Sequence, residues 1–316
     1  MSTPLSIKAP EEWPVGRVGF VALLGRPNTG KSTLLNTLLD YHLAAVSPRP
    51  QTTRRRLLGV YSTTDMQALF LDTPGVHAGD STLDVAMLEG VRRALRDADA
   101  VVLLGDPTRL PGQAEDQQVL ELAKACRKPI ILAINKRDAS NQEQQEAVRT
   151  FYGAGLPADT PVVKISALDK GSLGPLLAAL RTKLPEGPFL YPADMLTDTL
   201  ERHVGAELIR EVLLDQLSAE IPHAMAVEIE AWKEYDNQRE ISAVLHVERD
   251  SQKRIVIGEG GSMIKRIRVE SAKKLAELCG VPVHLDLWVK ISADWRKRKE
   301  RLDEFGLLPG FTGKGR

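Results

Sequence analysis

The sequence predicts an α/β domain with a mainly parallel six-stranded sheet, followed by a smaller α+β domain. Through the first 185 residues, short apolar runs alternate with longer stretches of helical periodicity, which is the pattern of βαβ units. Beyond residue 195 the order becomes helix, two adjacent strands, two helices and a strand. A glycine-rich loop between the first strand and the first helix adds a third observation, because such loops open nucleotide-binding folds.

The elements of the first domain follow from these runs. Strands are expected at residues 17–24, 57–62, 67–72, 100–105, 129–135 and 161–165, and helices at 31–39, 83–96, 115–126 and 173–184. Only a short polar turn separates the second and third strands, so these two are predicted to form an antiparallel hairpin at the sheet edge. The other strands are predicted to be parallel, with helices on both faces.

The domain boundary is predicted from a cluster of prolines and a glycine. Pro185, Gly187, Pro188 and Pro192 fall within eight residues that show no periodicity, which is typical of a linker. The second domain is expected to contain a helix over 204–213, strands at 226–232, 240–247 and 283–289, and a basic helix ending at 278. The predicted divisions are a tail at 1–16, a first domain at 17–184, a linker at 185–194, a second domain at 195–295, and a charged helix and tail at 296–316.

Composition excludes several classes of protein. Forty-two basic and forty-two acidic residues give no net charge, which argues against indiscriminate binding of polyanions. Cys126 and Cys279 lie far apart and show neither ligand spacing nor a disulfide framework. The apolar runs are far shorter than the ~20 residues that span a bilayer, and the first fifteen residues lack the apolar core of a secretory signal. We therefore expect a cytoplasmic protein.

A phosphate-binding loop is the strongest motif. Residues 25–32 read GRPNTGKS, which fits G-x-x-x-x-G-K-[ST] between a strand and a helix. The glycines let backbone N–H groups cradle phosphate oxygens, Lys31 is expected to reach the β- and γ-phosphates, and the Ser32 hydroxyl is expected to bind Mg²⁺. The loop residues predicted to contact the nucleotide are Gly25, Arg26, Pro27, Asn28, Thr29, Gly30, Lys31, Ser32 and Thr33.

Two later segments predict which base is bound. Asn135, Lys136 and Asp138 follow the strand at 129–135; the Asp138 carboxylate can accept hydrogen bonds from N1–H and the amino group of guanine. Asn135 is expected to brace the site, and the Lys136 stem to lie across the base. Ser166 and Ala167 end the last strand, where their N–H groups either contact the guanine carbonyl or belong to a helix N-cap.

The remaining phosphate-sensing segment is Asp72, Thr73, Pro74 and Gly75, at the end of the hairpin. Asp72 is expected to hold Mg²⁺ through water, and the Gly75 N–H to contact the γ-phosphate. Together with Ser32, Asp72 defines a predicted magnesium site.

The order GRPNTGKS, PQTTRRR, DTPG, NKRD and SA resembles the signature segments of translation-factor-class GTPases of the Era family. The resemblance implies a Ras-like P-loop G domain that binds GTP or GDP with Mg²⁺. It also makes residues 51–54 switch I, in which Thr52 or Thr53 binds Mg²⁺; we favour Thr53, which we also count as catalytic.

The residue after Gly75 bears on how water is activated. Ras-like enzymes place a glutamine there to orient the attacking water, but this sequence has Val76. The backbone of the switch segment, a partner or a monovalent cation must then orient the water. In related GTPases an asparagine at the position of Asn28 binds potassium, so the resemblance implies K⁺ and a catalytic role for Asn28. Lys31, which is expected to reach the β- and γ-phosphates, is also counted as catalytic. His77 is expected to be exposed and mobile.

The second domain contains a predicted RNA-binding loop. The G-x-x-G pattern occurs four times, but only Gly258-Glu259-Gly260-Gly261 lies between basic segments. The stretches HVERDSQKRIVIGEGGSMIK and VPVHLDLWVKI resemble the C-terminal type II KH domain of the Era family, whose loop clamps about four nucleotides. Ile267 is expected at the groove floor. The predicted RNA contacts are Lys253, Ile257, Gly258, Glu259, Gly260, Gly261, Lys265 and Arg266.

The alternative for the second domain is a purely structural module. The basic run at 296–299 is either further RNA surface or a solvated helix face.

The resemblance implies a GTP-hydrolysing switch that binds the 3′ end of 16S ribosomal RNA and acts in assembly of the 30S subunit. A weak peripheral association with the cytoplasmic face of the inner membrane is a lesser expectation, and no DNA partner is expected. Three alternatives remain at this point: a P-loop ATPase or kinase, a GTPase of the tRNA-modification or tandem-domain assembly type, and a nucleotide-gated RNA-binding protein with negligible turnover.

Overall fold

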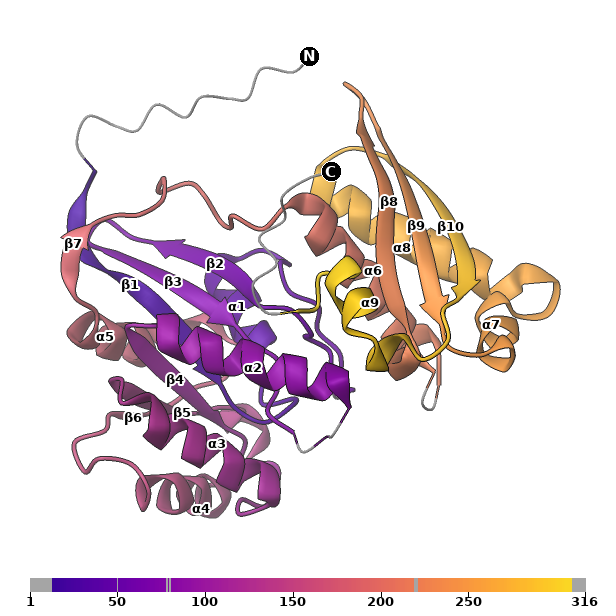
Figure 1. The fold of residues 1–316 in the computed structure, drawn as a ribbon. Helices are drawn as coiled ribbons and strands as arrows, with labels where there is room; N and C mark the ends of the chain where they lie inside the picture. The colour runs from indigo at the N-terminus through magenta and orange to yellow at the C-terminus, as the bar shows by residue number, and fades with distance from the viewer. Residues whose placement is uncertain (1–12, 50, 78, 80, 219–220, 309–316) are drawn as a thin grey trace.

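The structure is a computed structural model that describes residues 13–49, 51–77, 79, 81–218 and 221–308. Two lobes lie side by side and are joined by an extended segment (Figure 1). The first lobe contains β1 Val15–Leu24, α1 Lys31–Leu39, β2 Leu57–Ser62, β3 Met66–Asp72, α2 Thr82–Asp97, β4 Ala100–Gly105, α3 Ala114–Cys126, β5 Ile130–Ile134, α4 Gln142–Gly153, β6 Val162–Lys164, α5 Gly174–Lys183 and β7 Glu186–Pro188.

The first lobe has the predicted mainly parallel sheet, with one strand more than expected. The strand order is β2-β3-β1-β4-β5-β6, and the β2–β3 hairpin is antiparallel at the edge. The seventh strand, β7, pairs antiparallel with β1 at Val15–Pro188 and Arg17–Glu186, inside the proline-rich interval predicted to be linker. A short strand at a sheet margin tolerates prolines because few ladder hydrogen bonds are needed there. The predicted tail at 1–16 accordingly ends in β1, and its residues 1–12 lie outside the described residues.

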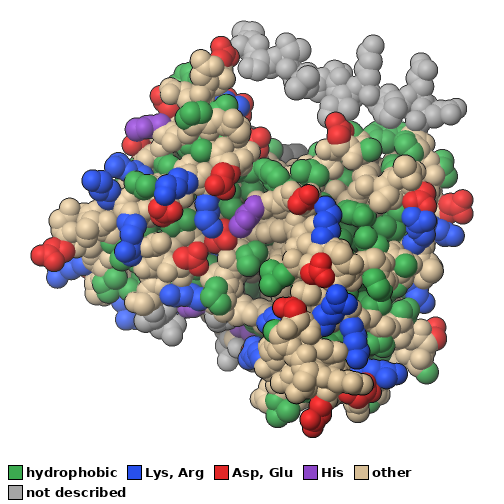
Figure 2. Space-filling model, turned by 180° about the vertical axis from the view of Figure 1, so that it is seen from behind, with side chains coloured by type: hydrophobic (Ala, Val, Ile, Leu, Met, Phe, Trp, Pro, Cys, Tyr) green, Lys and Arg blue, Asp and Glu red, His purple; other side chains and the backbone are tan. Residues whose placement is uncertain are grey.

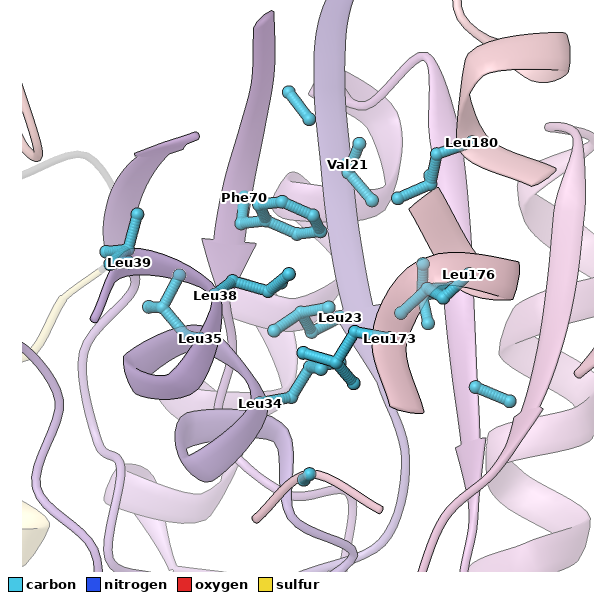
Figure 3. Close-up of a cluster of buried hydrophobic side chains, with 14 of the residues drawn as sticks. Val21, Leu23, Leu34, Leu35, Leu38, Leu39, Phe70, Leu173, Leu176 and Leu180 are labelled. Carbon is cyan, nitrogen blue, oxygen red and sulfur yellow. The ribbon is translucent and has the colours of Figure 1, made fainter. Parts of the chain in front are cut away.

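Two apolar clusters hold the first sheet between layers of helices. Successive β1 side chains point to opposite faces, so Val21 and Leu23 pack on one side and Ala22 and Leu24 on the other. Figure 3 shows α1 and the 173–180 segment covering the first side. The side chains that meet there are Leu34, Leu35, Leu38, Phe70, Leu173, Leu176 and Leu180. This packing fixes the carboxyl end of β1, from which the phosphate loop emerges.

The second lobe has the predicted element order of a type II KH domain. It contains α6 Glu201–Gln216, β8 Ala226–Glu234, β9 Arg239–Val247, α7 Asp250–Ile257, α8 Ser262–Cys279 and β10 Val283–Ile291. The sheet order is β10-β9-β8, with β8 antiparallel and β10 parallel to β9. Helices α6 and α8 share one core with this sheet. Within the described residues, none of the helices is long and apolar enough to cross a membrane.

The C-terminal segment joins the lobes. It was predicted to be a charged helix and tail, and it does form a short helix, α9 Lys299–Glu304. However, Trp295, Leu302 and Phe305 are each at most 2% exposed and pack in one cluster with Leu83 and Met87 of α2. The segment therefore has a buried apolar side, which its many charged residues did not indicate. Residues 309–316 lie outside the described residues.

Candidate functional site: a nucleotide cleft and an RNA loop

The phosphate loop connects β1 to α1 in a conformation that requires glycine. Gly30 has φ of 95°, and a Cβ there would lie 2.3 Å from Asn135 Nδ2. Lys31 arches back over the loop, where its Nζ donates to the carbonyls of Gly25 at 3.1 Å and Arg26 at 2.8 Å. Burial lowers the pKa of Lys31 to about 8, which leaves it mostly protonated at neutral pH. The loop thus holds a buried cation at the N-terminus of α1, which suits phosphate.

Three side chains predicted to bind Mg²⁺ converge beside this loop. Ser32 Oγ lies 2.8 Å from Thr53 Oγ1 and donates to Asp72 Oδ2 at 2.6 Å. Asp72 is fully buried, and its Oδ1 has no hydrogen-bond partner within the described chain. Two hydroxyls and an open carboxylate oxygen are the ligands that Mg²⁺ prefers, so these residues fit the ion. The Thr52 hydroxyl instead donates to the Arg49 carbonyl at 2.6 Å.

On the other side of the loop lies a cleft of about 770 Å³, lined by Lys136, Asp138 and the 166–168 segment. Asn135 organises it: its Nδ2 donates to the Thr29 carbonyl at 2.7 Å, and its Oδ1 accepts from the Ala167 N–H at 2.8 Å. Lys136 Nζ is 2.6 Å from Oδ2 of Asp106, a residue that the sequence motifs did not indicate. Asp138 is exposed at the cleft, as a carboxylate that meets a base must be.

The Ser166–Ala167 backbone is already hydrogen-bonded within the protein, and neither residue is the N-cap of the turn that follows. Its two N–H groups already donate to Ser172 Oγ at 2.9 Å and to Asn135 Oδ1. The cap of the following 3₁₀ turn is Asp169, whose side chain accepts from the Gly171 N–H at 3.0 Å. Ser166 and Ala167 therefore shape the cleft wall, and a guanine carbonyl would have to share their donors.

The segments around Pro48 and Gly75 contact the phosphate loop. Asn28, with φ of 64°, donates to the Pro48 carbonyl, just before switch I, at 2.5 Å. Gly75 packs so closely that a Cβ on it would lie 2.5 Å from Pro27 Cα, which explains the glycine. Val76 is 2% exposed, so its side chain lies in the core rather than toward the site.

His77 is not exposed and mobile, as we had expected. Its side chain is 15% exposed, and its Nε2 lies 2.8 Å from both Asp84 Oδ1 and Gln51 Nε2. Asp84 is fixed in turn because it caps α2 with Ser81. The prediction was wrong because the cap that orders this histidine lies beyond the motif.

Arg26 plays a structural part that the motif does not reveal. Its guanidinium turns away from the loop and is 2.7 Å from Asp116 Oδ2 on α3, with both side chains at most 2% exposed. Tyr152 on α4 donates to the other Asp116 oxygen at 2.6 Å. Only the backbone of Arg26 faces the nucleotide site. Because Arg26 and Asp116 are 90 residues apart, nothing local in the sequence pairs them.

The KH loop lies between α7 and α8. Gly258 has φ of 75°, and a Cβ there would lie 2.7 Å from Met263 Cβ, so the close helix packing needs glycine. Gly260 and Gly261 also have positive φ, and a Cβ on either would meet nothing within 4 Å, while the Gly261 N–H donates to the Gly258 carbonyl at 3.1 Å. Figure 2 shows the side of this lobe that carries α8, where Lys and Arg side chains gather among acidic ones.

The predicted RNA residues sit at this loop with one correction. Lys265 and Arg266 are exposed on the first turns of α8, Lys253 is partly exposed on α7, and Ile257 is half-buried. Ile267 is fully buried in the core of the lobe and cannot form the groove floor, because the 3.6-residue period of α8 turns it toward the sheet.

Comparisons with known proteins decide the family. A model described as a 50S ribosome-binding GTPase matches residues 20–136, and a KH-domain model matches residues 220–296. Proteins called GTPase Era from Heliobacterium modesticaldum and Ectopseudomonas mendocina are 39% and 40% identical to the chain. The matches cover 92% and 93% of this chain and 97% and 98% of those proteins. The chain belongs to the GTPase Era family.

Solved structures of Era agree. A single-residue variant of Aquifex aeolicus Era bound to GDP and AlF₄⁻ has a TM-score of 0.87 and 35% identity, covering 92% of this chain and 99% of that one. Era in complex with MgGDPNP and nucleotides 1506–1542 of 16S ribosomal RNA has a TM-score of 0.87 and 36% identity. This match covers 93% of this chain and 99% of that one. Family membership confirms the Ras-like G domain, the KH domain and GTP hydrolysis, and it excludes the ATPase, kinase and tandem-domain alternatives.

Proposed function

We propose that this GTPase is a molecular switch that binds 16S ribosomal RNA near its 3′ end through the KH domain and acts in 30S subunit assembly. The observation that carries the proposal is the free space beside Gly260 and Gly261 in a loop between basic helices. Such a loop suits the phosphates of a single strand. The Era that was solved with a 16S ribosomal RNA fragment supports the same partner.

We assign the nucleotide contacts from the geometry of the phosphate loop and of the cleft beside it. Lys31 binds the β- and γ-phosphates; Ser32, Thr53 and Asp72 hold Mg²⁺; and Asp138 accepts hydrogen bonds from guanine. When bound, Mg²⁺ neutralises charge on the phosphates. The full proposed set is Gly25, Arg26, Pro27, Asn28, Thr29, Gly30, Lys31, Ser32, Thr33, Asp72, Thr73, Pro74, Gly75, Asn135, Lys136, Asp138, Ser166 and Ala167.

On the RNA side, Lys253, Lys265 and Arg266 neutralise phosphates, while the Gly258–Gly261 backbone follows the strand. Ile257 offers an apolar contact for a base at the edge of the loop. Glu259 is exposed within the loop, and its charge keeps the strand's phosphates on the glycine side. We propose that the protein acts in the cytoplasm, where its proposed partner, the ribosomal subunit, is assembled.

The RNA proposal is tested with a Gly260→Asp variant. Aspartate tolerates the left-handed backbone at Gly260 and meets nothing within 4 Å, so the fold survives while a negative charge faces the strand. Fluorescence anisotropy with a single-stranded 16S 3′-end fragment should show binding weaker by about 5- to 150-fold, which corresponds to about 1–3 kcal/mol for such contacts. Gly280→Asp is the matched control, because Gly280 also has positive φ and open space.

The comparison is made with a GTP analogue and with GDP. Tight binding that needs both the intact loop and one nucleotide state supports the switch. Equal, weak and salt-sensitive binding by all three proteins in both states would show that the KH loop does not recognise RNA.

We further propose that K⁺ assists hydrolysis at Asn28. Buried Val76 cannot orient water, and Asn28 lies beside the Pro48 carbonyl, so oxygen ligands are available at the phosphate loop. Turnover in K⁺ should exceed turnover in Na⁺, and Asn28→Ala should remove the difference. Equal rates of the unaltered protein in the two salts would refute the role of K⁺.

A further inference from the structure

Switch I is attached to the KH domain by Arg54, the residue that follows Thr53. Its guanidinium donates to the Met225 carbonyl at 2.6 Å and to the His223 carbonyl at 2.7 Å. It also lies over the Trp295 ring, 5.7 Å from the ring centre. Arg54 is 3% exposed. One switch residue thus reaches across the domain boundary to two carbonyls of the second lobe and to Trp295 of the C-terminal segment.

Helix α6 of the KH domain contacts the same segment from its side. Arg210 donates to the Gln51 carbonyl at 3.1 Å, while its Nε donates to Glu207 Oε2 at 3.1 Å. Glu211 accepts from the Val46 N–H at 3.2 Å. The KH domain therefore holds switch I on both sides of Thr53.

The charge of Arg54 makes this attachment depend on the docked KH domain. Its hydrogen-bond acceptors are neutral carbonyls, and its Nε has no partner in the described part of the chain. Burial, with nearby Arg210, lowers the pKa of Arg54 to about 9, so it remains charged at neutral pH. A buried charge is tolerated only while its acceptors and the ring stay in place. Undocking the KH domain must therefore release Arg54.

We propose that Arg54 is a positioning residue of the GTPase: docked on the His223 and Met225 carbonyls, it holds Thr53 against Ser32 and Asp72. Through it, the docked KH domain favours the GTP-bound form over the GDP-bound form. The inference rests on the magnesium role proposed for Thr53, but not on the RNA partner. GDP lacks the γ-phosphate over which switch I closes, so its binding does not need this contact.

The test compares affinity for a non-hydrolysable GTP analogue and for GDP, both with Mg²⁺, together with the turnover rate. Arg54→Ala should lower analogue affinity and turnover by about tenfold, within the usual range of coupling between sites, and leave GDP affinity within about twofold. Arg54→Lys can reach one carbonyl and should be intermediate. The control is Arg56→Ala, since Arg56 is exposed and pairs with Asp97 at 2.8 Å.

An analogue-to-GDP affinity ratio unchanged by Arg54→Ala overturns the proposal. If Arg54→Ala also loses GDP, the fold is damaged and Arg54→Lys decides: a lowered ratio supports the proposal, and the wild-type ratio overturns it. A wild-type protein that fails to bind the 16S fragment would refute the ribosomal proposal while leaving this ratio measurable.

Discussion

Asp72 combines full burial with an oxygen that has no partner among the described residues. Burial raises its pKa to about 6, although the Ser32 hydrogen bond and Lys31 act in the opposite direction. Its folded-state pKa thus exceeds the ordinary value of 3.8. The stability associated with neutral Asp72 is present in full below about pH 3.8 and is lost as the pH rises through about 6. In the nucleotide-free protein at neutral pH, the ionised carboxylate is therefore destabilising.

We predict that Asp72→Asn stabilises the protein when nucleotide and Mg²⁺ are absent. The advantage should grow by about 1 kcal/mol between pH 5 and pH 7.5, because only the wild type ionises over that interval. Urea denaturation at the two pH values measures it. The same variant should lose Mg²⁺-dependent binding of GTP. An advantage that shrinks as the pH rises would show that Asp72 is not the group that titrates.

At the scale of elements, the phosphate loop depends on α3 and α4. Asp116 accepts from Arg26 of the loop and from Tyr152 of α4, and it also accepts from the Gln113 N–H at 3.1 Å as part of the α3 capping box. The buried ion pair therefore joins three elements whose motifs are unrelated in sequence.

We predict that Asp116→Ala costs about 3–5 kcal/mol of unfolding free energy, because it leaves the Arg26 charge buried and unpaired. Tyr152→Phe removes a single hydrogen bond to a charged group and should cost about 1.5–3 kcal/mol. Glu121→Ala, an exposed change on the same helix, is the control. If all three variants unfold at the same urea concentration, the pair does not stabilise the loop.

Elements were predicted correctly where the hydrophobic periodicity is regular. They were missed where pairing or packing with a distant segment decides the conformation. The alternating apolar runs predicted β1 to β6 and the order of the KH elements within a few residues. The strand β7 was missed because glycine and proline disfavour a strand locally; its pairing with the exposed end of β1 decides its conformation. The apolar side of the C-terminal segment was likewise hidden among charged residues.

At the scale of the whole molecule, the two domains are held together at switch I and at α2. Arg54 ties switch I to the KH domain, and Leu302 and Phe305 pack on α2, the helix that follows the Asp72–Gly75 segment. The Thr82 hydroxyl at the start of α2 also donates to the Lys297 carbonyl at 3.3 Å. Contacts between the two domains therefore adjoin both switch I and α2.

We predict that Leu302→Ala, at a fully buried position, destabilises the protein by about 2–5 kcal/mol. It should also shift Trp295 emission to longer wavelength, because the ring loses its cover before the domains unfold. Arg298→Ala, exposed in the same segment, should change neither property. Loss of stability without a change in emission would mean that the segment stays docked.

The sequence by itself determined the phosphate loop, the guanine and KH motifs, and the order of the elements. Each of these is encoded within a short stretch, because glycines and side-chain period fix the local backbone and the local chemistry. Only the tertiary structure decided which distant residues meet. Arg54 reaches a carbonyl 171 positions away, and Arg26 reaches Asp116 across 90. Such contacts depend on how helices pack against sheets and how the domains dock, which no local pattern records.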